Sequence, residues 1–128
     1  MHRAKRKVLA ALLLIAVPDV VFAHVQMIAS VPKDGAVAPA GLSEIEMRFS
    51  KPLRLTVVHV MQATEKKEIP LASELPKSFV SSAKLAVGAL SKGAYEVTWT
   101  AVADDGHVMN GSFGFSVSEA QPASPPAR

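Results

Sequence analysis

The sequence contains no cysteine. Without thiols the chain can form neither a disulfide framework nor a zinc, copper or redox site built on thiolates. Its stability must come from a packed core, and 128 residues are enough for one domain that buries such a core. The sequence also lacks a nucleophile-elbow motif around a serine and a glycine-rich phosphate loop, which excludes those two classes of site.

Excess positive charge is confined to the start of the chain. The formal net charge is +3, from 14 Lys and Arg against 11 Asp and Glu. Four of the basic residues and one acidic residue, Asp19, precede residue 24. The rest of the chain therefore has ten basic and ten acidic residues. No stripe of Lys and Arg interleaved with aromatic residues occurs, which excludes a nucleic-acid-binding protein.

Residues 1–23 have the pattern of a secretory signal peptide. Basic residues precede the apolar run Val8–Val17, and Val21-Phe-Ala23 follows as a small-residue cleavage site. The apolar run is too short for a transmembrane helix. We therefore expect export, cleavage after Ala23 and a mature chain that begins at His24; a leader retained as a membrane anchor is the alternative.

Alternation of apolar and polar residues dominates the rest of the chain. In Glu44–Phe49, Tyr95–Ala101 and Phe113–Val117 every second residue is apolar, which is typical of strands with one face in a core. Further strands are expected at Val25–Ala29, Leu55–Gln62, Glu68–Leu71, Ser78–Ser81 and Lys84–Val87. Turn residues are found at Pro32–Gly35, Pro39–Gly41, Lys51-Pro52, Ser91–Gly93 and Asn110-Gly111.

Short strands, frequent turns and no long helical period predict an all-β fold, an antiparallel sandwich or barrel, over residues 24–118. Trp99 lies on the apolar face of its strand and is expected to anchor the core, with a ligand-stacking role as the alternative. Residues 119–128 contain three prolines and little to pack, so we predict a disordered tail.

Histidines beyond the leader are the candidates for metal chemistry. As the first mature residue, His24 would offer its α-amine and a ring nitrogen to one ion. Asp105 and His107 are two residues apart, a spacing that points both side chains to one side of an extended segment, whereas Asp104 would point away. If the two ends of the domain meet, these donors form a tetragonal nitrogen and oxygen set.

That donor set suits Cu(II), one ion per mature chain, although zinc accepts the same ligand types. The alternative is that Asp104-Asp105-Gly106 is only a hairpin turn with a solvated histidine beside it. His59 lies in an expected strand with the parity of Val57 and Met61, which predicts a semi-buried, hydrogen-bonded structural residue. Met27 and Met109 are interpreted as core filler.

Several segments resemble the copper resistance protein C (CopC) family. His24-Val25, Ser30–Gly35 and Ile45–Ser50 resemble the opening of that family, and Gly93–His107 with Gly111–Val117 resembles its closing signature. The resemblance covers residues 24–118. It implies a periplasmic Greek-key β-barrel, cupredoxin-like or immunoglobulin-like, with a Cu(II) site at His24, Asp105 and His107. It also implies an inner-membrane copper transporter as partner.

One departure from the family concerns Cu(I). Some members carry a methionine-rich loop for Cu(I), often with a further histidine, but Met61–Pro70 contains one methionine and no histidine. Because Cu(I) needs several converging thioethers, the chain resembles a member that binds Cu(II) alone.

The leading hypothesis is a monomeric copper-binding protein for resistance or homeostasis, without catalysis. One alternative is a small copper oxidase with a histidine brace, although the single Trp99 and single Tyr95 provide no flat aromatic surface for a polysaccharide. The other is a metal-free immunoglobulin-like interaction module.

Overall fold

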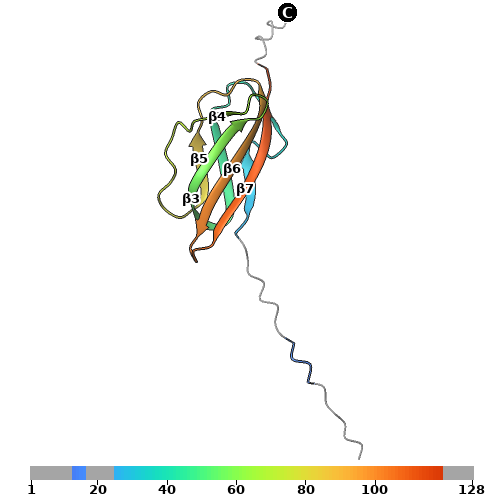
Figure 1. Cartoon of the computed structure of the whole chain (residues 1–128), viewed down its shortest axis with the longest axis vertical. Coiled ribbons are helices and arrows are strands. Elements are labelled where there is room, and N and C mark those ends of the chain that lie inside the picture. The colour runs from blue at the N-terminus through green and yellow to red at the C-terminus, as the bar shows by residue number, and fades with distance from the viewer. Residues whose placement is uncertain (1–12, 17–24, 120–128) are drawn as a thin grey trace, which may run out of the picture.

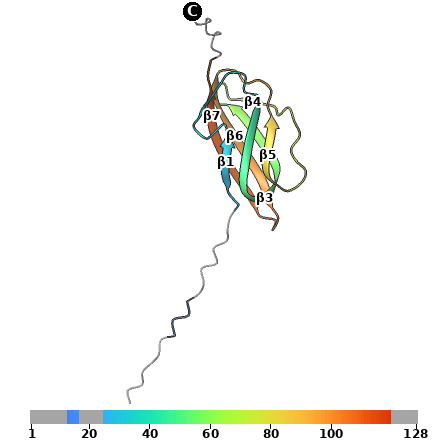
Figure 2. The ribbon, with the colours of Figure 1, turned by 180° about the vertical axis from the view of Figure 1, so that it is seen from behind.

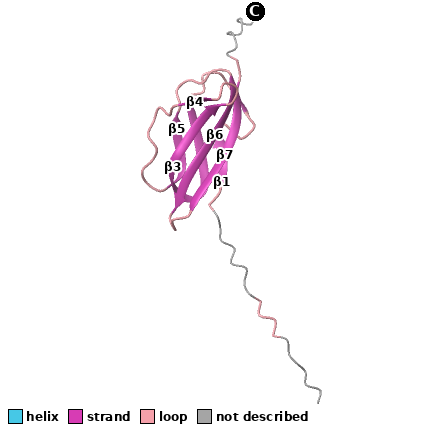
Figure 3. Cartoon of the chain, viewed as in Figure 1, coloured by secondary structure: helices cyan, strands magenta, loops and turns pink. Residues whose placement is uncertain are grey.

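A computed structural model describes residues 13–16 and 25–119. Every regular element within these ranges is a strand, and none of the described residues forms a helix long and apolar enough to cross a membrane (Figure 3). The strands are β1 (Met27–Val31), β2 (Val37–Ala38), β3 (Glu44–Gln62), β4 (Lys67–Ile69), β5 (Val80–Ala86), β6 (Gly93–Ala103) and β7 (Val108–Val117). The all-β prediction is confirmed. His24, most of the expected leader and residues 120–128 lie outside the described residues.

The strands form one seven-stranded sheet that curls around a core, with β3 as its central strand (Figures 1 and 2). The order along the sheet is β1-β3-β6-β7-β2, and β4 and β5 pair with β3 outside this path. The first half of β3 lies between β1 and β5, and its second half lies between β4 and β6. β2 runs parallel to the end of β7 and the other pairs are antiparallel.

Three turns or breaks expected from the sequence are wrong. Lys51-Pro52 lies inside β3, between the residues that pair with β1 and those that pair with β6. A proline is tolerated there because the ladder requires no backbone donor at that point. Asn110-Gly111 lies within β7, where the two residues pair with Thr100 and Trp99. The strands expected at 78–81 and 84–87 are one continuous strand, β5.

A register irregularity in β3 changes the face on which His59 lies. Leu53 and Leu55 are buried before it, and Val58 and Val60 are buried after it. The pairing with β6 shifts between Leu55 and Val57, so the inward parity changes from odd to even residues. His59 therefore lies on the outer face with 53% of its side chain exposed, and the expectation that it is semi-buried is wrong.

The core is built around aromatic side chains from β3, β6 and β7. Trp99 is 5% exposed, and its ring meets that of Phe49 edge to face, with centroids 5.1 Å apart. Tyr95 stacks on Phe115 at 5.6 Å. Fully burying each such side chain contributes about 1.5–3 kcal/mol, so the aromatic cluster is a major part of the stability. The prediction that Trp99 anchors the core is confirmed.

Candidate metal centre

The β6–β7 turn holds the two described residues of the expected metal site. The Ala103 N–H donates to the His107 carbonyl at 2.9 Å, and the Gly106 N–H donates to the Ala103 carbonyl at 3.0 Å. Gly106 has φ +87°, a conformation that residues with a Cβ rarely adopt. These features form a tight turn, as the Asp-Asp-Gly sequence predicts, and leave Asp105 and His107 exposed at its tip.

Asp105 binds His107 through both carboxylate oxygens. Oδ1 accepts the backbone N–H of His107 at 3.0 Å, and Oδ2 lies 2.6 Å from the ring Nδ1. The backbone hydrogen bond is the larger cause, and the ring hydrogen bond the second, of a pKa for Asp105 below its ordinary value. Because an ionised carboxylate only accepts hydrogen bonds, Nδ1 must carry a proton and donate it.

This pairing occupies Nδ1 and leaves Nε2 as the ring nitrogen that can bind a metal ion. The side chain is 75% exposed, so a metal ion can reach that nitrogen. A histidine that ligates through one nitrogen and donates the other N–H to a carboxylate is the usual arrangement at metal centres, because the carboxylate fixes the tautomer and the ring orientation. The structure therefore brings together Asp105 and His107 as the spacing predicts.

The described part of the chain does not by itself complete a metal site. Among its residues no group of three or more His, Asp or Glu side chains could hold an ion. The missing donors would come from His24, which lies outside the described residues, so its part in the site remains a prediction.

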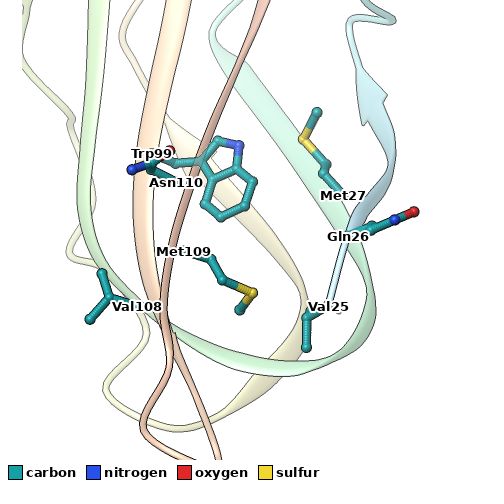
Figure 4. A pocket seen from close by; sticks show the side chains of 7 residues that line it. All are labelled: Val25, Gln26, Met27, Trp99, Val108, Met109 and Asn110. Atoms are coloured by element: carbon teal, nitrogen blue, oxygen red, sulfur yellow. The ribbon is translucent and has the colours of Figure 1, made fainter. Parts of the chain in front are cut away.

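The residue that follows His24 lies near the β6–β7 turn. Val25 and Val108 line one open pocket of about 420 Å³, formed by residues 25–27, residues 108–110 and Trp99 (Figure 4). Figures 1 and 2 place the start of β1 and the β6–β7 turn at the same end of the barrel. Each histidine is thus one residue away from the lining of the same pocket.

The pocket also brings together residues that sequence reasoning treats separately. Met27 and Met109 come from different ends of the domain, and both line it beside Trp99 (Figure 4). The only signal in the sequence is that each methionine is two or three residues from a candidate histidine. That signal cannot be read without knowing that β1 and β7 approach one another.

His59 does not join this group. Its Nδ1 lies 2.6 Å from Oε1 of Glu68 on the outer face of β3 and β4. Both side chains are more than half exposed, at 53% and 58%, so the pair contributes little to stability. The predicted hydrogen bond of His59 is present, with Glu68 as its partner within the described residues.

Comparisons with known proteins give a consistent answer. Residues 27–118 match the family model of the CopC domain. The chain is 25% identical over 124 residues to the copper transport protein CutJ of Bacillus subtilis (strain 168). That match covers 94% of this chain but 23% of CutJ, so the chain spans less than a quarter of the length of this relative.

Two solved structures have similar folds. The crystal structure of CopC from Methylosinus trichosporium OB3b matches with a TM-score of 0.64 and 18% identity, covering 79% of this chain and 100% of that one. PcoC, a methionine-rich copper resistance protein from Escherichia coli, matches with a TM-score of 0.60 and 26% identity, covering 75% and 100%. At 18% identity the first likeness supports the fold alone.

Proposed function

Because this chain belongs to the CopC family of copper-related proteins, we propose that it is an exported protein that binds Cu(II) and holds or delivers it without catalysis. The observation that carries the proposal is the Asp105–His107 pair, in which both carboxylate oxygens hold an exposed imidazole with Nε2 free. A solvated turn histidine needs no such restraint.

The copper ion is the cargo, and the donors fit it. Nε2 of His107 supplies one nitrogen, and His24 would supply its α-amine and a ring nitrogen once the leader is removed. Asp105 holds Nδ1, on the side of the ring opposite Nε2, so in this conformation it orients His107; as a ligand of the same ion, the role that the resemblance implies, it would have to release Nδ1. Neutral nitrogens with one carboxylate oxygen suit Cu(II), and one ion per mature chain follows.

The cellular role rests on the family and on its relatives. The family and the leader pattern support a periplasmic location. CutJ is described as a copper transport protein and is much longer than its matching region, so one chain can combine a domain like this with a larger transport protein. This supports delivery of copper to an inner-membrane copper transporter as the role of this chain, acting as a monomer.

A Cu(II) titration of two mature forms tests the proposal. One form begins at His24 and the other carries one extra residue before it, which removes the terminal amine from the site. We expect one tightly bound equivalent in the authentic form, with a nitrogen-rich tetragonal electron paramagnetic resonance spectrum. The extended form and a His107→Ala variant should bind much more weakly.

His59→Ala in the authentic form is the matched control, because His59 lies on the outer face with Glu68. The His59→Ala variant should bind Cu(II) as tightly as the unchanged protein. Equal binding by the authentic and extended forms would place the site away from the terminus, and no stoichiometric binding would favour the metal-free interaction module. Ascorbate-driven oxidation of chitin or cellulose by the copper-loaded protein would favour the oxidase instead.

A further inference from the structure

Both backbone groups of Gln26 are hydrogen-bonded to Ser50. The Gln26 N–H donates to Oγ of Ser50 at 2.9 Å, and the Ser50 N–H donates to the Gln26 carbonyl at 2.8 Å. β1 itself begins one residue later, where Met27 lies opposite Phe49. In a regular antiparallel pair the Gln26 N–H would donate to a backbone carbonyl. A serine hydroxyl replaces that carbonyl here and extends the β1–β3 pairing by one residue toward the start of the chain.

Ser50 stands at the last place where β3 can hold the start of β1. Within the described residues the β1–β3 pairing ends at Phe49, and β3 pairs with β6 from Leu53 onward. A chain terminus frays unless it is tied to the fold. Ser50 therefore determines how far toward the terminus the sheet fixes the backbone.

Val25 is held through its side chain rather than its backbone. It is half-buried against the core, and it lines the same pocket as Val108, the residue that follows His107 (Figure 4). The residue before Gln26 is thus fixed at the pocket beside the β6–β7 turn. Only His24 then separates Val25 from the expected cleavage point.

The reach from Gln26 to the mature terminus is short. Each residue of an extended chain spans at most about 3.6 Å, so the Cα atom of His24 cannot lie farther than about 7 Å from that of Gln26. A restraint on the Gln26 backbone therefore restrains the terminal amine as well. A frayed start would have to be ordered when an ion binds, and that ordering lowers the affinity.

We propose that Ser50 is a positioning residue for the candidate Cu(II) centre, because it holds, through Gln26, the terminus that supplies the donors of His24. This inference rests on the proposed function. The Ser50 hydroxyl accepts the Gln26 N–H, so it acts through the backbone rather than on the ion. It prepares the terminus to meet the Asp105–His107 turn and lowers the ordering cost of copper binding. The two partners are 24 residues apart in the sequence, so no local pattern predicts this role.

The test compares mature proteins that differ only at residue 50, by competitive Cu(II) titration and by hydrogen exchange of the metal-free forms. Ser50→Ala removes the hydroxyl from an exposed position and keeps the backbone bond to Gln26. We expect Cu(II) affinity to fall by about three- to tenfold, the effect of losing one hydrogen bond, and the Gln26 amide to exchange faster. Ser50→Thr keeps a hydroxyl and should restore both values. Ser50→Val has the shape of threonine without the hydroxyl and should behave like Ser50→Ala.

Ser30→Ala is the matched control. Ser30 lies near the other end of β1, and its hydroxyl also donates one hydrogen bond, to the Pro32 carbonyl at 2.9 Å. The Ser30→Ala variant should keep both the Cu(II) affinity and the Gln26 exchange rate of the unchanged protein. A second control adds one residue before His24, which already removes the terminal amine. In that extended form Ser50→Ala should weaken the residual Cu(II) binding no further.

Failure of this inference is distinguishable from failure of the proposed function. Tight Cu(II) binding that is equal in the unchanged protein, Ser50→Ala and Ser50→Val would leave the proposed function standing and overturn the positioning role, even if the Gln26 amide exchanges faster. Equal losses of affinity in the authentic and extended forms would also overturn it, because Ser50 would then act on the fold in general. Absence of Cu(II) binding by the unchanged protein would overturn both.

Discussion

At the scale of single residues, Asp105 contributes to the candidate centre by holding His107 rather than by stabilising the fold. Its two oxygens hold the backbone and the ring of His107, and its side chain is 57% exposed. Asp105→Asn keeps the shape but removes the charge and one acceptor oxygen. We expect Cu(II) affinity to fall by about 10–100-fold, the usual cost of losing such a partner, as measured by competitive titration.

The neighbouring Asp104 provides the control for this prediction. It is exposed in the same turn and takes no part in the hydrogen bonds of His107. Asp104→Asn should therefore leave Cu(II) affinity and the melting temperature unchanged. If the two asparagine variants bind alike, the carboxylate of Asp105 contributes only general negative charge.

Gly111 is a second residue whose identity follows from one contact. A Cβ at this position would meet the Trp99 ring at 2.6 Å, and that ring is fixed in the core against Phe49. Gly111→Ala should destabilise the protein by about 1–3 kcal/mol, the cost of overpacking, with a changed Trp99 fluorescence spectrum. Gly114→Ala in the same strand meets its nearest atom at 3.4 Å and should cost clearly less in urea unfolding.

The sequence predicts some of these residue roles and not others. The spacing of Asp105 and His107 is local, so the period of an extended chain is enough to place them on one side. The contact of Gly111 with Trp99 and the meeting of Met27 with Met109 depend on which strands are neighbours. No local pattern contains that information, so the sequence predicts a turn at Asn110-Gly111, where the structure has the interior of β7.

At the scale of elements, Asp34 connects the β1–β2 loop to β7 through a side-chain hydrogen bond. Its Oδ1 accepts the Gly114 N–H at 2.8 Å, and the Gly35 N–H donates to the Gly114 carbonyl at 2.7 Å. Asp34→Ala should cost about 1 kcal/mol of unfolding free energy and speed hydrogen exchange at the Gly114 amide. Lys33→Ala, one residue away and also exposed, is the control. Equal exchange in both variants would contradict this role.

β3 shows why strand boundaries are harder to predict than strands. Its alternation is clear on both sides of Lys51-Pro52, yet the proline predicts two strands with a turn between them. The chain continues because β3 exchanges one pair of neighbours for another and absorbs the extra residue as a bulge. Long-range pairing, which the sequence pattern does not record, decides that β3 continues through Lys51-Pro52 and where its bulge lies. The bulge in turn places His59 on the outer face.

At the scale of the whole molecule, folding and copper binding are separable. The core is a continuous cluster of buried apolar side chains from β3, β5, β6 and β7, whereas Asp105 and His107 are exposed at the tip of a turn. The metal-free protein should therefore be fully folded, unlike small domains whose structure depends on the ion. Far-ultraviolet circular dichroism before and after treatment with a chelator should be the same.

Copper should nevertheless raise the melting temperature, because an ion that binds only the folded state stabilises it by mass action. Free Cu(II) at about 100 times its dissociation constant contributes roughly 2.7 kcal/mol. For a domain of this size each kcal/mol shifts the midpoint by about 4–8 °C, so we expect a rise of roughly 10–20 °C in calorimetry. The form with an extra residue before His24 should show a much smaller rise. Equal rises in both forms would mean that the ion binds without the terminal amine, and hence that the folded barrel alone supplies the stabilising donors.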